Sequence, residues 1–166
     1  FSKIKVAQFR SEGAMQVVSG DYGKEKIHYE APPFDTLENE MSSFIKWFNE
    51  TSTTLEIAAI THLWFVIIHP FDDGNGRLTR AITERVLAQS DDSAQRFYSM
   101  SAQILKQRND YYKILERTQK GGTDITDWLV WFLQTLEQAL ITAQTTTDTI
   151  INKANFWQMY KKHPLN

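Results

Sequence analysis

The sequence predicts an all-α bundle of six to eight helices with one small β-hairpin attached. Two observations lead to this fold class. From residue 34 onward, apolar residues recur at the three- and four-residue spacing of amphipathic helices. Before residue 34, two short β-prone runs are separated by turn-forming residues, which is typical of a hairpin. With 166 residues, of which 42% are hydrophobic, the chain is long enough to bury one core.

The composition excludes several classes of function. A net charge of −2 gives the chain no general attraction for nucleic acids or anionic membranes. The absence of cysteine excludes a disulfide framework and a thiolate metal site. No signal peptide pattern is visible at the start of the sequence. We therefore expect a cytoplasmic protein without a membrane partner.

The first 33 residues form an N-terminal segment that contains the expected hairpin. Its β-prone runs are Met15–Val18 and Lys26–Tyr29. The residues that favour a turn between them are Ser19, Gly20, Asp21 and Gly23. The pair Pro32–Pro33 ends the second run, because proline cannot donate a backbone hydrogen bond.

The next two segments are predicted to be helices with different surroundings. One apolar face is formed by Leu37, Met41, Phe44 and Phe48. The following segment, Leu55–Ile68, is apolar nearly all round but too short to span a membrane. A helix of this kind is normally the buried centre of an all-α domain.

The rest of the chain is also predicted to be helical. Leu78, Ile82 and Val86 form an apolar stripe, and further helices are expected around residues 111–115 and 128–140. The aromatic residues expected in the core are Trp128, Trp131 and Phe132. Helical segments over 137–151 and 151–161 would extend the bundle. We expect a helical core over residues 34–145, and a C-terminal helix over 146–166 that leads to a segment outside this chain.

The stretch HPFDDGNGRLTR, residues 69–80, concentrates the chemistry of the chain. Glycines at 74 and 76 permit backbone conformations that turn successive N–H groups towards an anion. A helix that starts near Arg77 adds its positive N-terminal end. Arg77 and Arg80 are three residues apart, which places their guanidinium groups on one helix face. These features favour a polyphosphate ligand.

Two further residues suggest how that ligand is used. Asp73, rather than the neighbouring Asp72, is the candidate ligand for a divalent cation that bridges phosphate oxygens. His69 follows the apolar helix and could take a proton from a hydroxyl nucleophile. His62 has no such context, so we assign it a packing or surface role. The residues thus predict a Mg²⁺-nucleotide site with a histidine base, and they leave open which phosphorus is attacked.

The same stretch resembles the motif of the Fic family at every fixed position. The matching residues are His69, Pro70, Phe71, Asp73, Gly74, Asn75, Gly76, Arg77 and Arg80. The hairpin with HYEAPP is similar to the flap of that family, and RNDYYKILERTQKGG and DWLVWFLQTL are similar to its later helices. MQVVSG and THLWF resemble the bacterial branch that carries an extra N-terminal helical domain and a C-terminal winged helix. Nucleic acid would then be bound only through a segment outside this chain.

The resemblance implies transfer of AMP from ATP, with Mg²⁺, to a Ser, Thr or Tyr hydroxyl of a protein, including self-modification, and release of pyrophosphate. It implies that His69 is the general base, Asp73 the magnesium ligand and Phe71 the structural anchor of the loop. Nucleotide-binding residues would be Asp73, Gly74, Asn75, Gly76, Arg77, Arg80, Tyr111, Tyr112, Leu115 and Gln119. One of the two tyrosines is expected to pack inward while the other meets adenine. The target would dock by strand addition on Ile27, His28, Tyr29 and Glu30, although His28 could instead be a surface residue of the hairpin.

Regulation and reaction type stay open at this level. Many Fic proteins carry an inhibitory Ser/Thr-x-x-x-Glu-Gly/Asn helix, and the nearest matches here, Thr36…Glu40 and Ser52…Glu56, lack the final residue. We therefore expect autoinhibition, if present, to come from a segment outside this chain or from a partner. The partners expected for the chain also include a second copy of itself in a homodimer. A chain without that segment would then be derepressed. The alternatives to AMP transfer are AMP removal or transfer of another phosphate-bearing group at the same site, or a non-catalytic nucleotide-binding module.

Overall fold

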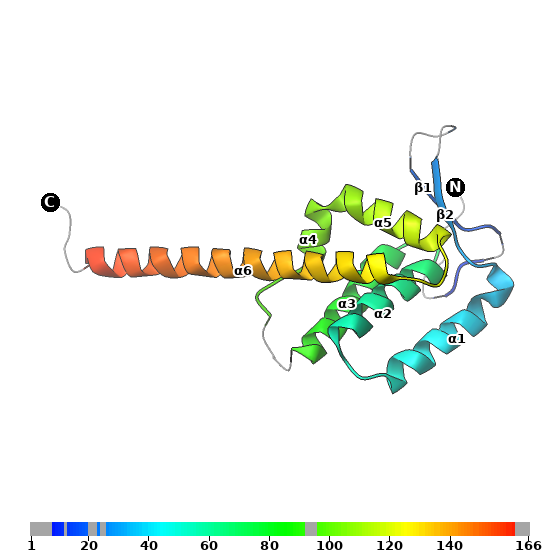
Figure 1. Cartoon of the computed structure of the whole chain (residues 1–166), viewed down its shortest axis with the longest axis horizontal. Coiled ribbons are helices and arrows are strands. Elements are labelled where there is room, and N and C mark those ends of the chain that lie inside the picture. The colour runs from blue at the N-terminus through cyan, green and yellow to red at the C-terminus, as the bar shows by residue number, and fades with distance from the viewer. Residues whose placement is uncertain (1–7, 12, 20–22, 24–25, 92–95, 162–166) are drawn as a thin grey trace.

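Six helices and a two-stranded hairpin make up the described part of the chain, which confirms the predicted fold class. The computed structural model describes residues 8–11, 13–19, 23, 26–91 and 96–161. Its elements are β1 (Gln16–Ser19), β2 (Lys26–Glu30), α1 (Phe34–Glu50), α2 (Leu55–Ile68), α3 (Asn75–Ser90), α4 (Met100–Lys106), α5 (Arg108–Lys120) and α6 (Thr126–Lys161). Figure 1 shows the hairpin at one end of the helical body and α6 projecting far beyond the other end.

The hairpin forms where the sequence predicts it. β1 and β2 pair antiparallel, with Gln16 opposite Glu30, and the register shifts between Val17 and Val18. The backbone N–H of Ala31 donates to the carbonyl of Met15 at 2.8 Å and continues the pairing beyond the strands. The expected turn residues Gly20 and Asp21 lie outside the described residues.

Helix α2 is the centre of the bundle, as its uniformly apolar sequence predicts. It contacts α1, α3 and α6. Its N-terminus is capped by the hydroxyl of Thr54, which accepts from the N–H of Ile57 at 3.3 Å. One side of α2 packs with the predicted face of α1, where Leu37, Met41 and Phe44 are buried. The other sides pack into a larger core shared with α3 to α6.

The buried face of α3 differs from the predicted stripe. Val86 is buried and Ile82 packs against the α1–α2 core, but Leu78 is 42% exposed. The N-terminal half of α3 instead buries Thr79 and Thr83, whose hydroxyls donate to the carbonyls four residues earlier. Each hydroxyl is therefore satisfied, and this face can be polar although it points into the protein.

The C-terminal segments form one helix rather than an extension of the bundle. Helix α6 is continuous over 36 residues, and its buried residues end at Ala139. Beyond that point the helix carries exposed apolar side chains, among them Ile150 and Trp157. Apolar residues at helical spacing indicated the helix correctly, but they did not indicate whether it has a neighbour. None of the described helices combines the length and apolarity that crossing a membrane would require.

The indole of Trp128 joins α6 to the central helix, which gives a test of the core. Trp128 is fully buried, and its Nε1–H donates to the carbonyl of Ala59 at 2.9 Å. We expect Trp128→Phe to lower the free energy of unfolding by about 1–3 kcal/mol, because it removes this hydrogen bond and leaves a cavity where the larger indole packed. Urea denaturation measures the change. Trp157→Phe, at a position 64% exposed, is the matched control, and an equal loss in both variants would contradict this role.

Candidate functional site

The motif residues lie on a short turn between the end of α2 and the start of α3. α2 ends at Ile68, and His69 closes it in the left-handed conformation, with φ of 50°. Gly74, with φ of 86°, precedes the first residue of α3. Both positive φ angles turn the chain sharply, and at 74 glycine adopts such an angle without strain. The backbone N–H groups of the first turn of α3 therefore open next to His69.

Asn75 holds this turn closed from inside. Its side chain is buried, accepts from the N–H of Phe71 at 2.9 Å and donates to the carbonyl of Phe71 at 2.6 Å. The Asn75 amide group therefore faces the protein, so only its backbone N–H is left for the expected phosphate cradle. Phe71, the expected anchor, is partly buried against the α1–α2 core, and its ring centroid lies 5.8 Å from that of Phe9.

The imidazole of His69 is held in one tautomer. Its Nδ1 lies 3.3 Å from the carbonyl oxygen of Val66, which can only accept, so Nδ1 carries the proton. The other nitrogen, Nε2, is then left with a lone pair. Burial lowers the pKa of His69, the Val66 carbonyl opposes this shift, and the charge of Arg10 adds to it. A neutral histidine with an available Nε2 is suited to accept a proton.

His69 opens onto a cavity of about 380 Å³, which is within the size range of small-ligand sites. The cavity gathers residues from the hairpin, α2, α3, α4 and α5. Nine of the residues singled out from the sequence line it: His28, Tyr29, His69, Gly76, Arg80, Tyr111, Tyr112, Leu115 and Gln119. These nine residues are separated by up to 91 positions in the chain, from residue 28 to residue 119, and the structure brings them together.

The two motif arginines have different surroundings. Arg80 lines the cavity with His69 and is partly buried. Arg77 is 72% exposed on the motif turn, where its guanidinium lies 3.0 Å from the carboxylate of Asp73. An exposed pair of this kind contributes only about 0–1 kcal/mol, so a phosphate group could displace it at little cost.

Asp73 fits a metal ion only in combination with a phosphate ligand. One of its oxygens accepts from the N–H of Gly74 at 2.6 Å and the other from Arg77. Among the residues described, no cluster of three or more His, Cys, Asp or Glu could hold a metal by itself. Mg²⁺ commonly binds through one or two carboxylates, phosphate oxygens and water, which is compatible with the exposed carboxylate of Asp73 beside the predicted phosphate cradle.

The flap strand is attached to the helices through its side chains. His28 Nδ1 lies 2.9 Å from a carboxylate oxygen of Glu116 on α5, so this histidine bridges the flap and α5. The hydroxyl of Tyr29 donates to the carbonyl of Ile67, near the end of α2, at 3.0 Å. Ile27 is 48% exposed, and Glu30 accepts from the side chain of Gln16 across the hairpin. These contacts leave target docking by the strand a prediction.

Tyr111 and Tyr112 point in different directions, as expected for neighbours on a helix. Tyr112 is 41% exposed at the cavity, and the guanidinium of Arg108 lies 5.6 Å from its ring centroid. Tyr111 is buried, and its hydroxyl lies 3.0 Å from Nε2 of His62. The inward residue of the pair is therefore Tyr111.

His62 connects Tyr111 to α3 through a line of hydrogen bonds. The hydroxyl of Thr83 donates to a backbone carbonyl, so it accepts from Nδ1–H of His62 at 3.1 Å. Nε2 of His62 then accepts from Tyr111. Burial, assisted by the charge of Arg80, lowers the pKa of His62 to about 3, which keeps it neutral. The expected packing role of His62 is thus also a role in hydrogen bonding.

Sequence reasoning missed three polar residues near the site. Arg108 and Glu116 line the cavity, and the sequence signal for them was their spacing from Tyr112 and Gln119 on one helix face. Arg10 is buried and donates to the carbonyl of His69, 59 residues later in the chain. No local pattern marks Arg10, because both its burial and its partners come from distant segments.

Comparison with known proteins relates this arrangement to one family. Residues 2–87, just over half of the chain, match the model of the Fic/DOC family. The chain is 31% identical over 94 residues to the protein adenylyltransferase Fic of Nematostella vectensis, covering 54% of this chain and 21% of that protein. It is 34% identical over 104 residues to that of Drosophila yakuba, covering 60% and 19%. The chain thus spans about a fifth of these relatives.

Solved structures agree with the fold. A Fic family protein from Desulfovibrio desulfuricans G20 superposes with a TM-score of 0.72 at 25% identity, over 88% of this chain and 43% of that one. A Fic domain containing signaling protein from Bacteroides thetaiotaomicron superposes with a TM-score of 0.61 at 20% identity, over 87% of this chain and 55% of that one. The second likeness concerns the fold alone.

The neutral state of His62 predicts how stability depends on pH. The unfolded chain takes up a proton near the ordinary pKa of 6.5, whereas the folded chain does so only at about 3. Stability should therefore fall as the pH falls from about 6.5, by up to about 1.4 kcal/mol per unit. His62→Gln, which can donate and accept but does not titrate, should flatten this dependence. Urea unfolding between about pH 5 and pH 7 measures it, and equal slopes in both proteins would contradict the assignment.

Proposed function

Because the chain belongs to the Fic/DOC family, we propose that it transfers AMP from ATP to a Ser, Thr or Tyr hydroxyl of a protein. The observation that carries the proposal is the state of His69. It is a neutral imidazole with its Nδ1 proton directed to Val66, and it borders a cavity that Arg80, Tyr112 and Gln119 also line. The names of the similar adenylyltransferases support the choice of reaction.

In the proposed step, His69 Nε2 takes the proton of the target hydroxyl. The hydroxyl oxygen forms a bond to the α-phosphorus of ATP, and the bond from that phosphorus to the bridging oxygen of pyrophosphate breaks. Pyrophosphate leaves with the negative charge, and protein-O-AMP remains. The lowered pKa of His69 suits this role, because the base must be unprotonated before the hydroxyl attacks.

The phosphates are proposed to lie between Arg80, the first turn of α3 and Arg77. Backbone N–H groups at a helix N-terminus and guanidinium groups both favour the charge of a leaving pyrophosphate. When bound, a magnesium ion would add positive charge at the phosphate oxygens, and Asp73 is the residue proposed to hold it. The weak Asp73–Arg77 pair frees both side chains for these roles at small cost.

The adenine is proposed to lie at the α5 side of the cavity, between Tyr112, Leu115 and Gln119. Tyr112 offers an exposed ring face for stacking, and the Gln119 amide can both donate to and accept from a base edge. Hydrogen bonds to the target backbone are proposed for β2, because within the described sheet it pairs with β1 alone and so keeps one edge.

Label transfer from ATP tests the reaction directly. The isolated protein is incubated with Mg²⁺ and ATP labelled at either the α- or the γ-phosphorus, and a lysate is supplied only with the α-labelled ATP. We expect protein labelled only from the α-position, and a rate about 10²–10⁴-fold lower in His69→Ala, with ATP still bound by that variant. Label from the γ-position would instead indicate a kinase. ATP binding without any label would favour AMP removal or a binding module.

The adenine assignment has its own test. Tyr112→Ala should raise the KM for ATP about tenfold, because it removes the stacking surface of the base. The matched control is Phe97→Ala, which removes an aromatic ring that is 77% exposed and not part of the cavity lining. Steady-state kinetics of label transfer at varied ATP give both values. An unchanged KM in Tyr112→Ala would place the base elsewhere.

A further inference from the structure

We propose that Arg10 is a positioning residue, which holds the end of the flap strand in a fixed place relative to the turn that carries His69. The inference rests on the proposed function, since it concerns how target and base are brought together. Arg10 lies outside the motif and outside the lining of the nucleotide cavity. Its side chain and backbone bond to three carbonyl oxygens that belong to two distant segments of the chain.

The contacts of Arg10 join the motif turn to the flap. Its backbone N–H donates to the carbonyl of Pro70 at 2.9 Å, and its Nε donates to that of His69 at 3.0 Å. Its Nη2 donates to the carbonyl of Pro32, two residues after the end of β2. The carbonyls of His69 and Pro70 follow the C-terminus of α2, where a positive charge is favourable. One side chain thus fixes both segments at once.

Arg10 makes these hydrogen bonds inside the protein and not at its surface. Arg10 is 1% exposed, and its Nη1 has no hydrogen-bond partner among the described atoms. Burying a guanidinium costs desolvation free energy that an apolar side chain of similar volume would not, so what an arginine adds at this position is its hydrogen bonds. The planar guanidinium can donate in several directions at once, whereas the single ammonium of lysine cannot reproduce that geometry.

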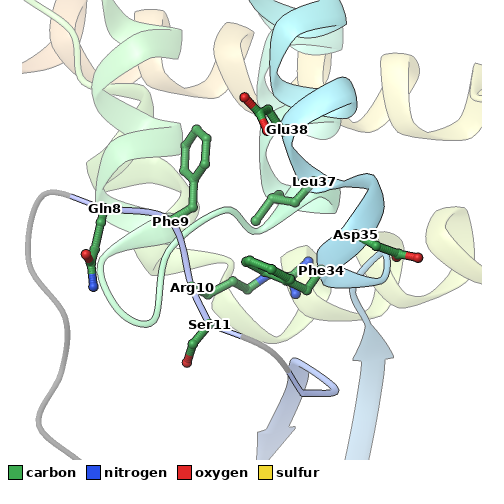
Figure 2. Close-up of a pocket in the computed structure, with 8 residues that line it drawn as sticks. All are labelled: Gln8, Phe9, Arg10, Ser11, Phe34, Asp35, Leu37 and Glu38. Carbon is green, nitrogen blue, oxygen red and sulfur yellow. The ribbon is translucent and has the colours of Figure 1, made fainter.

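A second hydrogen bond acts between the same two parts of the molecule. The hydroxyl of Tyr29 donates to the carbonyl of Ile67. The flap is therefore attached near the end of α2 at two points, through Tyr29 within β2 and through Pro32 just after it. Figure 2 shows Arg10 with Phe34 and Leu37 around a cavity between residues 8–11 and the first turn of α1. Arg10 therefore borders a separate cavity, away from the α5 residues proposed to hold adenine.

If Arg10 positions the flap relative to His69, its loss should affect the rate of AMP transfer and the affinity for ATP differently. Where a target strand pairs with β2, its hydroxyl must reach Nε2 of His69, and misplacement by about 1 Å can cost on the order of 10²-fold in rate. Loss of the Arg10 side-chain hydrogen bonds, which we call the clamp, should therefore reduce the rate of AMP transfer without reducing ATP affinity. A residue needed only for folding would instead lower both together.

Three variants test this. Arg10→Met keeps most of the volume and removes the side-chain donors, Arg10→Lys keeps the charge, and Gln8→Met changes an exposed neighbour of the same cavity. For Arg10→Met we expect ATP affinity by calorimetry within about twofold of wild type and transfer about 100-fold slower. Arg10→Lys should recover part of the rate, and Gln8→Met should match wild type. Amide hydrogen exchange at His69 and Phe71 should be about tenfold faster in Arg10→Met, with α6 unchanged.

The exchange measurement separates this inference from the proposed function. If wild type transfers no AMP, faster exchange confined to the motif turn and the flap in Arg10→Met still supports the clamp. Unchanged exchange there overturns the clamp, whether or not wild type is active. Parallel losses of ATP affinity, transfer and exchange protection throughout the protein would also overturn it, because they would make Arg10 an ordinary residue of the fold.

Discussion

The burial of α2 is the constraint on which the rest of the structure depends. This helix is apolar on nearly every side, so it is stable only when other helices surround it, and α1, α3 and α6 do so. Its last turn therefore ends inside the protein, where carbonyl groups need partners. The left-handed turn at His69, the Asn75 side chain and Arg10 together supply the turn geometry and the hydrogen bonds that this ending requires. The position of His69, the candidate base, therefore follows from the way in which the buried helix α2 ends.

Buried polar groups around α2 explain why one face of α3 is polar. His62 enters the core from α2 and needs both a donor and an acceptor there. Thr83 supplies the acceptor and Tyr111 the donor, and Thr79 continues the line of hydroxyls to the carbonyl of Asn75. Threonines on this face therefore occupy positions where an apolar stripe would ordinarily lie, and Leu78 is turned outward. The same hydrogen bonds connect the wall of the cavity beside His69 with the motif turn.

Some contacts of the site can be replaced by contacts with a ligand, whereas others are buried and must stay intact. Asp73 and Arg77 form an exposed pair whose small stabilisation allows a ligand to replace it. Asn75, His62 and Arg10 are buried, and removing a partner from any of them would leave a desolvated polar group unpaired. Along the motif, the buried Asn75 thus lies between the two members of the replaceable Asp73–Arg77 pair. This division is what a site needs if it is to keep its geometry while phosphates enter and leave.

The sequence by itself determined the helices, the hairpin and the chemistry of the motif, because each of these depends on residues that are close together in the chain. Helical spacing identified α1 and α2, turn residues identified the hairpin, and the order of residues 69–80 indicated a phosphate site with a histidine base. Only the tertiary structure decided which faces are covered. Leu78 and the distal part of α6 have the apolar spacing of core residues yet are exposed, since spacing does not reveal whether a neighbour exists. Arg10 and His62 have hydrogen-bond partners 21 to 60 residues away, and such pairings arise only when the chain is folded.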